Sequence, residues 1–307
     1  MRITGTFLDE ISYDIPHQNW GYKEWDRDFQ SMKSIGIDTV IQIRCGHNGF
    51  ITYPSKVLTT KAQCFMPPTD LVEMFLELSE KYGMKFYFGT YDSGNCWKDA
   101  NFELELDINK EVVSEVWTKY GKHKAFKGWY LATEISRRRG SAVEAIAGLG
   151  RYCKEISDNL PVLISPLING IKQNRDLGLD KGSIPLAEHE AEWDSILGSL
   201  EGAVDQLAFQ DGHVELKELA GYLKINCALA RKHGIECWTN CETFDRDMPI
   251  KFLPIKWEKM WNKLQIAEAA GIEKAITFEF SHFMSPNSCY PQAHGLFDRY
   301  REYAGLT

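Results

Sequence analysis

The sequence predicts an α/β fold, a single (β/α)₈ barrel that takes in residues 1–307. Short runs rich in β-branched and aromatic residues alternate with amphipathic stretches of helical period, and the alternation occurs eight times. No glycine-rich phosphate loop follows an early strand, as an open doubly wound sheet would favour. A chain of 307 residues is also long enough for one barrel with extended loops.

The first half of the chain contains four predicted strands, at residues 2–9, 39–45, 85–91 and 126–134. The first helix is expected at 22–35, where Trp25, Phe29 and Met32 are spaced along one face and Gly36 follows. Thr69 is expected to cap the second helix, which ends at Gly83. A third helix is expected at about 109–120.

The second half repeats the pattern. Strands are expected at 161–168, 204–211, 236–244 and 274–283, and helices at 142–157, 188–200, 215–233, 257–270 and 292–303. Strict alternation favours parallel strands joined by right-handed crossovers, and eight repeats favour closure into a barrel.

Composition excludes several classes of protein. The net charge is −8 and no basic stripe extends beyond residues 137–139, which argues against a nucleic-acid partner. No apolar run approaches the roughly 18 residues of a membrane span, and the polar first strand leaves no room for a signal peptide. The eight cysteines lack metal-ligand spacing and are expected to be free thiols. We therefore expect a cytoplasmic protein without a cofactor; the sequence does not determine its oligomeric state.

In a barrel of this kind the chemistry lies at the C-terminal ends of the strands. The predicted strand ends are unusually rich in ionisable and amide side chains, and strongly acidic. Loops are polar in any protein, but that explains Glu134 and Glu242 poorly. The residues at these ends are Asp9, Glu10, Arg44, His47, Asp92, Glu134, Asn169, Gln210, Asp211, Glu242, Glu279 and His282.

Strand alternation predicts that Glu134 and Glu242 both emerge from the barrel interior. Along 236–242, Trp238 and Asn240 share the face of Glu242, whereas the odd-numbered residues face the helices. Along 128–134, Glu134 shares its face with Tyr130, whereas the apolar Trp129 and Leu131 face the helices. The two carboxylates thus belong to the fourth and seventh strands, on roughly opposite sides of the barrel.

Two carboxyl groups across a cleft suit glycoside hydrolysis. One must be protonated to donate to the leaving oxygen, and the other ionised to attack or to activate water. A separation of about 5–5.5 Å would imply retention and a wider one inversion. The sequence does not supply the distance.

Several segments carry a resemblance to a known family. They are residues 5–7 (Gly–Thr–Phe), 25–29, 32–40, 128–131 (Gly–Trp–Tyr–Leu) and 238–242 (Trp–Thr–Asn–Cys–Glu). Together they resemble DUF4434, a family of proposed glycoside hydrolases, over most of the chain. Glutamates ending strands four and seven also resemble the large clan of retaining glycosidases with (β/α)₈ barrels.

The resemblance implies that Glu134 is the acid/base and Glu242 the nucleophile. The clan usually has Asn before the acid/base, whereas this chain has Thr133. The hydrogen bond to the sugar 2-hydroxyl would then be lost, or supplied by a group such as Asn169 or Asn240. Tyr91 and Tyr290 are candidates for the tyrosine that often supports the nucleophile.

Other side chains are candidates for substrate binding. Arg44 is expected to point inward, opposite to Ile41 and Ile43, where it could orient the nucleophile or form a structural ion pair with a rim acid. Glu279 is expected to face inward. Trp20, Trp97 and Trp193 could stack on sugars, although simple packing is commoner for such residues. The full set of expected substrate-binding residues is Arg44, Asp92, Asn169, Trp238, Asn240, Glu279 and His282.

Two alternatives stay open beside a glycosidase of small glycosides or oligosaccharides. A metal-dependent sugar isomerase could draw its ligands from Glu134, His213, Glu242, Glu279 and His282. A non-catalytic carbohydrate-binding barrel is the other, and Thr133 would be its sign of lost activity. For any of these, the long loops 46–68 and 169–185 could wall the cleft.

Overall fold

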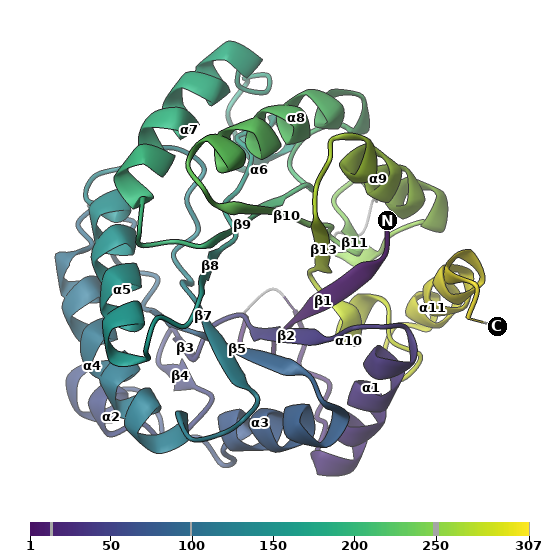
Figure 1. Cartoon of the computed structure of the whole chain (residues 1–307). Helices are drawn as coiled ribbons and strands as arrows, with labels where there is room; N and C mark the ends of the chain where they lie inside the picture. Colours follow the sequence, from purple (N-terminus) through teal and green to yellow (C-terminus); the bar gives the residue numbers. More distant parts are fainter. Residues whose placement is uncertain (13–14, 99, 248–251, 307) are drawn as a thin grey trace.

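The computed structural model describes residues 1–12, 15–98, 100–247 and 252–306. Eight parallel strands close into a barrel in the order β1-β13-β10-β9-β8-β7-β5-β2, and helices surround it (Figure 1). The single (β/α)₈ barrel predicted from the sequence is confirmed. The strands are β1 (Ile3–Leu8), β2 (Thr39–Gln42), β5 (Lys85–Gly89), β7 (Phe126–Tyr130), β8 (Val162–Ile164), β9 (Gln206–Gln210), β10 (Glu236–Asn240) and β13 (Lys274–Thr277).

The helices that follow the strands pack around the barrel as an outer layer. They are α1 (Tyr22–Ser34), α3 (Leu71–Tyr82), α4 (Glu103–Tyr120), α5 (Ala142–Ile156), α7 (Leu186–Leu200), α8 (Leu216–Lys232), α9 (Trp257–Ala269) and α11 (Pro291–Ala304). The expected cap of α3 was wrong by one residue. Asp70, not Thr69, caps it, because the Asp70 carboxylate accepts a hydrogen bond of 3.1 Å from the backbone N–H of Glu73.

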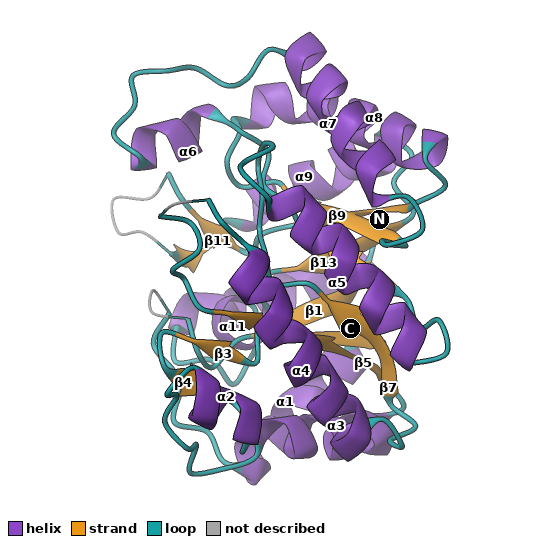
Figure 2. Cartoon of the chain, turned by 90° about the vertical axis from the view of Figure 1, so that its left-hand side faces the viewer, coloured by secondary structure: helices purple, strands orange, loops and turns teal. Residues whose placement is uncertain are grey.

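The loops contain short elements that the sequence pattern did not reveal. They are β3 (Gly46–His47), β4 (Phe50–Ile51), β6 (Tyr91–Asp92), β11 (Phe244–Asp245), β12 (Leu253–Pro254), α2 (Lys56–Lys61), α6 (Ile171–Asp176) and α10 (Phe280–Phe283). Figure 2 shows β3, β4, β11 and α6 on one side of the barrel, the side at which the strands end. The expected strand 274–283 was therefore wrong beyond Thr277, because residues 280–283 form a helical turn.

Two apolar layers confirm the alternation predicted for β7 and β10. Tyr130, Ala132 and Trp238 belong to a cluster inside the barrel, together with Phe7, Ile41, Ile43, Tyr87, Leu163, Ala208 and Ile276. Trp129 and Leu131, with Cys237 and Cys241, belong to the larger cluster between the strands and the helices. All eight cysteines are free thiols. Within the part of the chain that the structure describes, no helix is long and apolar enough to cross a membrane.

Candidate active site

Glu134 and Glu242 meet at one cavity of about 100 Å³, called here the central cavity. Both residues follow the ends of their strands, Glu134 after β7 and Glu242 after β10. The remaining lining is partly polar and partly aromatic. It consists of Ser12, Ile15, Ile43, Arg44, Gln210, Phe244, Arg246, Phe252, Phe278 and Phe283.

Glu242 is held as an ionised carboxylate. Nε and Nη2 of Arg246 donate to its two oxygens at 3.0 and 2.9 Å, a bidentate ion pair. The residue is 1% exposed. Burial acts to raise the pKa of Glu242, but the charge and hydrogen bonds of Arg246 outweigh it and lower the pKa to about 2. The side chain therefore carries a negative charge throughout the neutral range.

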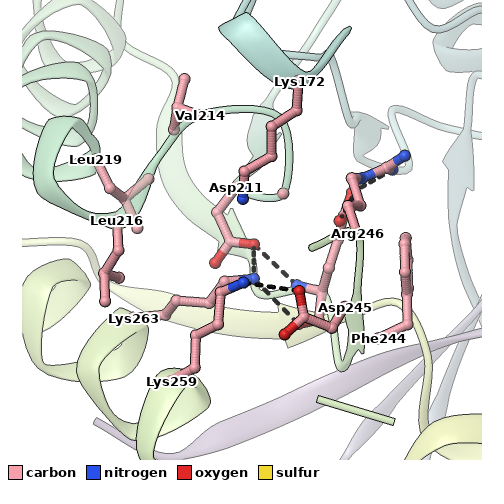
Figure 3. A pocket seen from close by; sticks show the side chains of 12 residues that line it. Lys172, Asp211, Val214, Leu216, Leu219, Phe244, Asp245, Arg246, Lys259 and Lys263 are labelled. Carbon is pink, nitrogen blue, oxygen red and sulfur yellow. Dashed lines mark hydrogen bonds and ion pairs between the residues drawn. The ribbon is translucent and has the colours of Figure 1, made fainter. Parts of the chain in front are cut away.

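A buried ion pair fixes the backbone beneath Glu242. Nζ of Lys263, on α9, donates to Oδ1 of Asp211 at 2.6 Å and to the carbonyl oxygen of Glu242 at 3.1 Å. The backbone N–H of Glu242 donates to the same Asp211 oxygen at 3.0 Å. Figure 3 shows Lys263 and the neighbouring Lys259 pointing toward Asp211 and Asp245. The nucleophile candidate thus has little freedom to move.

Gly212 leaves the space that the Glu242 carboxylate occupies. A Cβ atom at this position would lie 1.6 Å from Oε2 of Glu242, far inside van der Waals contact. The φ angle of Gly212 is not positive, so glycine is required by this close approach rather than by backbone conformation.

Glu134 lies in a different electrostatic environment. The hydroxyl of Tyr130 donates to Oε1 of Glu134 at 3.2 Å. Burial raises the pKa of Glu134 to about 7; Arg44 acts to lower it and the Asp92 carboxylate to raise it. At neutral pH a substantial fraction of Glu134 is therefore protonated, as a general acid requires.

Arg44 and Asp92 lie beside Glu134. Nη1 of Arg44 donates to Oδ2 of Asp92 at 3.0 Å, and it lies 3.5 Å from Nδ1 of His47. Of the two roles expected for Arg44, the structure shows the ion pair with a rim acid, Asp92, whereas Arg246 binds Glu242. The strand face predicted for Arg44 was wrong, because Ile41 and Ile43 face the interior. Arg44 follows the end of β2 and nevertheless lines the central cavity.

Of the seven expected substrate-binding residues, only Arg44 is among the described residues that line the central cavity; the six others are Asp92, Asn169, Trp238, Asn240, Glu279 and His282. Trp238 packs inside the barrel, where its Nε1 donates to Glu236 at 3.2 Å. Asn240 is buried and donates to Oγ of Ser165 at 3.1 Å. Asn169 lies in the loop after β8, and its backbone carbonyl accepts a hydrogen bond from Ile184.

Glu279 and His282 form a buried pair outside the central cavity. The Glu279 carboxylate accepts hydrogen bonds from the backbone N–H groups of Ser281 and His282 and thereby caps α10. Nδ1 of His282 lies 2.7 Å from Glu279 and its Nε2 lies 2.9 Å from the carbonyl oxygen of Pro16. The prediction that Glu279 faces inward was wrong, because Ile276 takes the interior position on β13 and the strand ends at Thr277.

The metal-site hypothesis drew on residues that the structure separates. Glu279 and His282 pair with one another, whereas Glu242 pairs with Arg246. Within the described residues, no group of three or more His, Cys, Asp or Glu side chains is arranged to hold a metal ion. His213 was also a candidate ligand in that hypothesis, and its pKa is lowered to about 4, mainly by burial.

Sequence reasoning missed the groups that distinguish the two glutamates. Arg246 follows Glu242 by four residues in an irregular segment, where no period indicates contact. Tyr130 was recognised as an interior residue but not as the partner of Glu134. The tyrosines that were proposed lie elsewhere, and Tyr290 stacks on Phe283. Of the three tryptophans, Trp193 is buried, Trp97 packs against Phe102, and Trp20 lines a second cavity.

Comparison with known proteins gives one close match and several distant ones. A family model described as a domain of unknown function (DUF4434) matches residues 3–290. The crystal structure of a proposed α-L-fucosidase from Bacteroides thetaiotaomicron VPI-5482 has 55% sequence identity and a TM-score of 0.96, covering 100% of this chain and 94% of that one. A search of curated proteins found no match.

Two further structures share the fold at low sequence identity. A hyperthermostable endo-1,4-β-D-mannanase from Thermotoga petrophila RKU-1 has 14% identity and a TM-score of 0.60, covering 100% of both chains. An intracellular xylanase from Thermoanaerobacterium saccharolyticum has 12% identity and a TM-score of 0.53, covering 90% of this chain and 85% of that one. At this identity the likeness concerns the barrel alone.

Proposed function

The chain belongs to the DUF4434 family, and from this premise we propose that it is a glycoside hydrolase with Glu134 as general acid/base and Glu242 as nucleophile. One observation carries the proposal. Two carboxyl groups, the half-buried Glu134 and the buried Glu242, line one small cavity, and their surroundings shift their pKa values in opposite directions, to about 7 for Glu134 and about 2 for Glu242. Such a divided pair supplies an acid and an anion at the same pH.

The two groups would divide a double displacement between them. Glu134 donates its proton to the glycosidic oxygen while the bond from that oxygen to the anomeric carbon breaks. A Glu242 oxygen forms the new bond to the anomeric carbon, which gives a glycosyl-enzyme. Water then attacks the same carbon, Glu134 accepts its proton, and Glu242 leaves. Each oxygen of the Glu242 carboxylate has two lone pairs. The hydrogen bond from Arg246 occupies one of them, and the other can attack the anomeric carbon.

We infer the substrate class from the crystal structure with 55% sequence identity described above. The protein from Bacteroides thetaiotaomicron is named as a proposed α-L-fucosidase and shares 55% of its residues with this chain. We therefore place α-L-fucosides first among the glycosides that the central cavity accepts.

Hydrolysis of nitrophenyl glycosides by the purified protein tests the proposal. The panel begins with the α-L-fucoside and is run with and without EDTA. Activity should persist with the chelator and fall by about 10³-fold or more in Glu134→Gln and Glu242→Gln. Glu144→Gln, an exposed carboxylate on α5, is the matched control. NMR identifies which anomer of the sugar is released first and so shows whether the anomeric configuration is retained or inverted. Net inversion would refute the nucleophilic role of Glu242.

Two other results would count against the mechanism. Activity that disappears with EDTA would indicate a metal-dependent barrel. Binding of glycans without turnover of any glycoside would indicate a carbohydrate-binding barrel, the reading that Thr133 suggested.

A further inference from the structure

A second and larger cavity adjoins the central cavity. Its volume is about 600 Å³, within the usual range of ligand sites, and we call it the side cavity. Ser12 and Ile15 line both cavities, so the two lie next to one another at the loop between β1 and α1. The rest of the side-cavity wall comes from this loop and from the segment 47–71 that follows β2.

The wall of the side cavity combines flat rings with hydrogen-bonding groups. Phe50 is 61% exposed and Trp20 is half-buried, so both present ring surface to solvent. Around them lie side chains that donate and accept hydrogen bonds, among them His17, Asn19 and Thr52. A sugar offers the complement of such a wall, with apolar C–H faces for the rings and hydroxyl groups for the polar side chains.

A chain of contacts connects the side cavity to Glu134. His47 lines the side cavity, and its Nδ1 lies 3.5 Å from Nη1 of Arg44 and 3.6 Å from Oδ2 of Asp92. Arg44 and Asp92 are the two charged groups with the strongest electrostatic effect on Glu134. The side cavity therefore opens on the side of Glu134.

Glu242 has no corresponding connection to the side cavity. The groups that hold it are Arg246, which follows β11, Asp211, which follows β9, and Lys263, on α9. None of these is among the described residues that line the side cavity. This asymmetry indicates how a substrate would be oriented in the two cavities. A general acid protonates the oxygen of the leaving group, so it must lie on the leaving-group side of the scissile bond.

We infer that the side cavity is the leaving-group subsite, and that the protein releases one terminal sugar from a glycan whose next residues occupy this cavity. The inference rests on the proposed function and adds the substrate class, an oligosaccharide rather than a simple glycoside. The unequal volumes of about 100 and 600 Å³ agree with it, since the smaller space contains both carboxyl groups and the larger one has room for the rest of the chain.

Phe50→Ala tests the inference, because its exposed ring can be removed without opening the core. The probes are the nitrophenyl glycoside that the panel above identifies as a substrate and a trisaccharide with the same sugar on lactose, which is 2′-fucosyllactose if that sugar is fucose. Phe50→Ala should lower kcat/KM about fivefold on the trisaccharide, mainly through KM, and change it less than about twofold on the nitrophenyl glycoside. Trp261→Ala, which removes an exposed ring from α9, should change neither value. Equal effects of Phe50→Ala on both probes, or none on the trisaccharide, would overturn the inference.

Binding of lactose alone separates a failure of this inference from a failure of the proposed function. Saturation-transfer NMR requires no turnover and would detect lactose in the side cavity even if every glycoside proved inert. We expect a signal with the wild type and with Trp261→Ala, and a much weaker one with Phe50→Ala. No signal with the wild type, or equal signals from all three proteins, would show that the side cavity is not a sugar subsite.

Discussion

The two candidate catalytic residues have the same chemistry and burial acts to raise the pKa of both, yet their pKa values move apart. The difference lies in the hydrogen bonds that the neighbouring arginine donates to each glutamate. Arg246 gives both of its hydrogen bonds to Glu242, whereas Arg44 gives its hydrogen bond to Asp92 and acts on Glu134 only through its charge. Desolvation is therefore overcome at Glu242 and prevails at Glu134.

This difference predicts the pH dependence of activity. Glu134 must be protonated and Glu242 ionised in the free protein, so kcat/KM should be highest below about pH 7. Above that value it should fall about tenfold per pH unit, because the acid with a pKa of about 7 loses its proton. A pH–rate profile of kcat/KM checks it. A value that keeps rising to pH 9 would contradict the assignment of Glu134 as the acid.

Gly212→Ala should impair catalysis without changing any polar group. The new methyl group would lie within 1.6 Å of Oε2 of Glu242, so the carboxylate must move away from its ion pair with Arg246. We expect kcat to fall about 10²-fold, as misplacement by about an ångström commonly causes.

Gly198→Ala is the matched control for that substitution. It adds the same methyl group in α7, where the nearest atom, on His233, is 3.6 Å away. Helix propensity should make this variant about 0.5–1 kcal/mol more stable, with normal activity. Kinetics and thermal unfolding of both variants are the measurements; full activity in Gly212→Ala would show that the position of Glu242 does not matter.

At the scale of elements, α9 stabilises the ends of two strands through one lysine. Lys263 lies on α9, and its ammonium group binds Asp211 after β9 and the carbonyl of Glu242 after β10. Lys263→Met would leave the Asp211 carboxylate buried without its cation, which typically costs about 3–5 kcal/mol. Urea denaturation measures the loss. The double variant Lys263→Met with Asp211→Asn should recover part of it, and an equally unstable double variant would contradict the ion-pair explanation.

The elements also show what the sequence could and could not predict. Alternation correctly gave the inward faces of β7 and β10. It failed for Arg44 and Glu279, because Ile41 and Ile276 face the interior and alternation does not say which of two buried strand faces points inward. Arg246 was beyond prediction for another reason, since a period of two or 3.6 residues says nothing about contacts in the segment that follows a strand.

At the scale of the whole molecule, strand order separates the two functions of the site. β7 and β10 lie three steps apart in the barrel, with β8 and β9 between them, so each glutamate receives neighbours from a different part of the rim. Loops that follow β1 and β2 add the side cavity next to Glu134. The periodic part of the sequence predicted the barrel, whereas segments without a period line the side cavity that we propose as the leaving-group subsite.

His282 contacts the loop between β1 and α1, in which Ser12 and Ile15 line both cavities. Both ring nitrogens of His282 face acceptors, the Glu279 carboxylate and the carbonyl oxygen of Pro16, so both must carry a proton. Burial acts to lower the pKa of His282, but Glu279, Glu10 and Asp9 together raise it to about 9. In the unfolded chain the value is about 6.5.

The raised pKa predicts how folding stability depends on pH. The folded state binds the extra proton between about pH 6.5 and 9, so the contribution of His282 is complete below pH 6.5 and is lost as pH rises through 9. His282→Gln should therefore be clearly less stable than the wild type at pH 6 and nearly as stable at pH 9. Chemical denaturation of both proteins at several pH values measures this difference, in which the titration of groups that do not interact with His282 cancels; Glu10 does interact with it. A difference independent of pH would mean that His282 stabilises the loop as a neutral side chain, and the interpretation of its two hydrogen bonds would have to change.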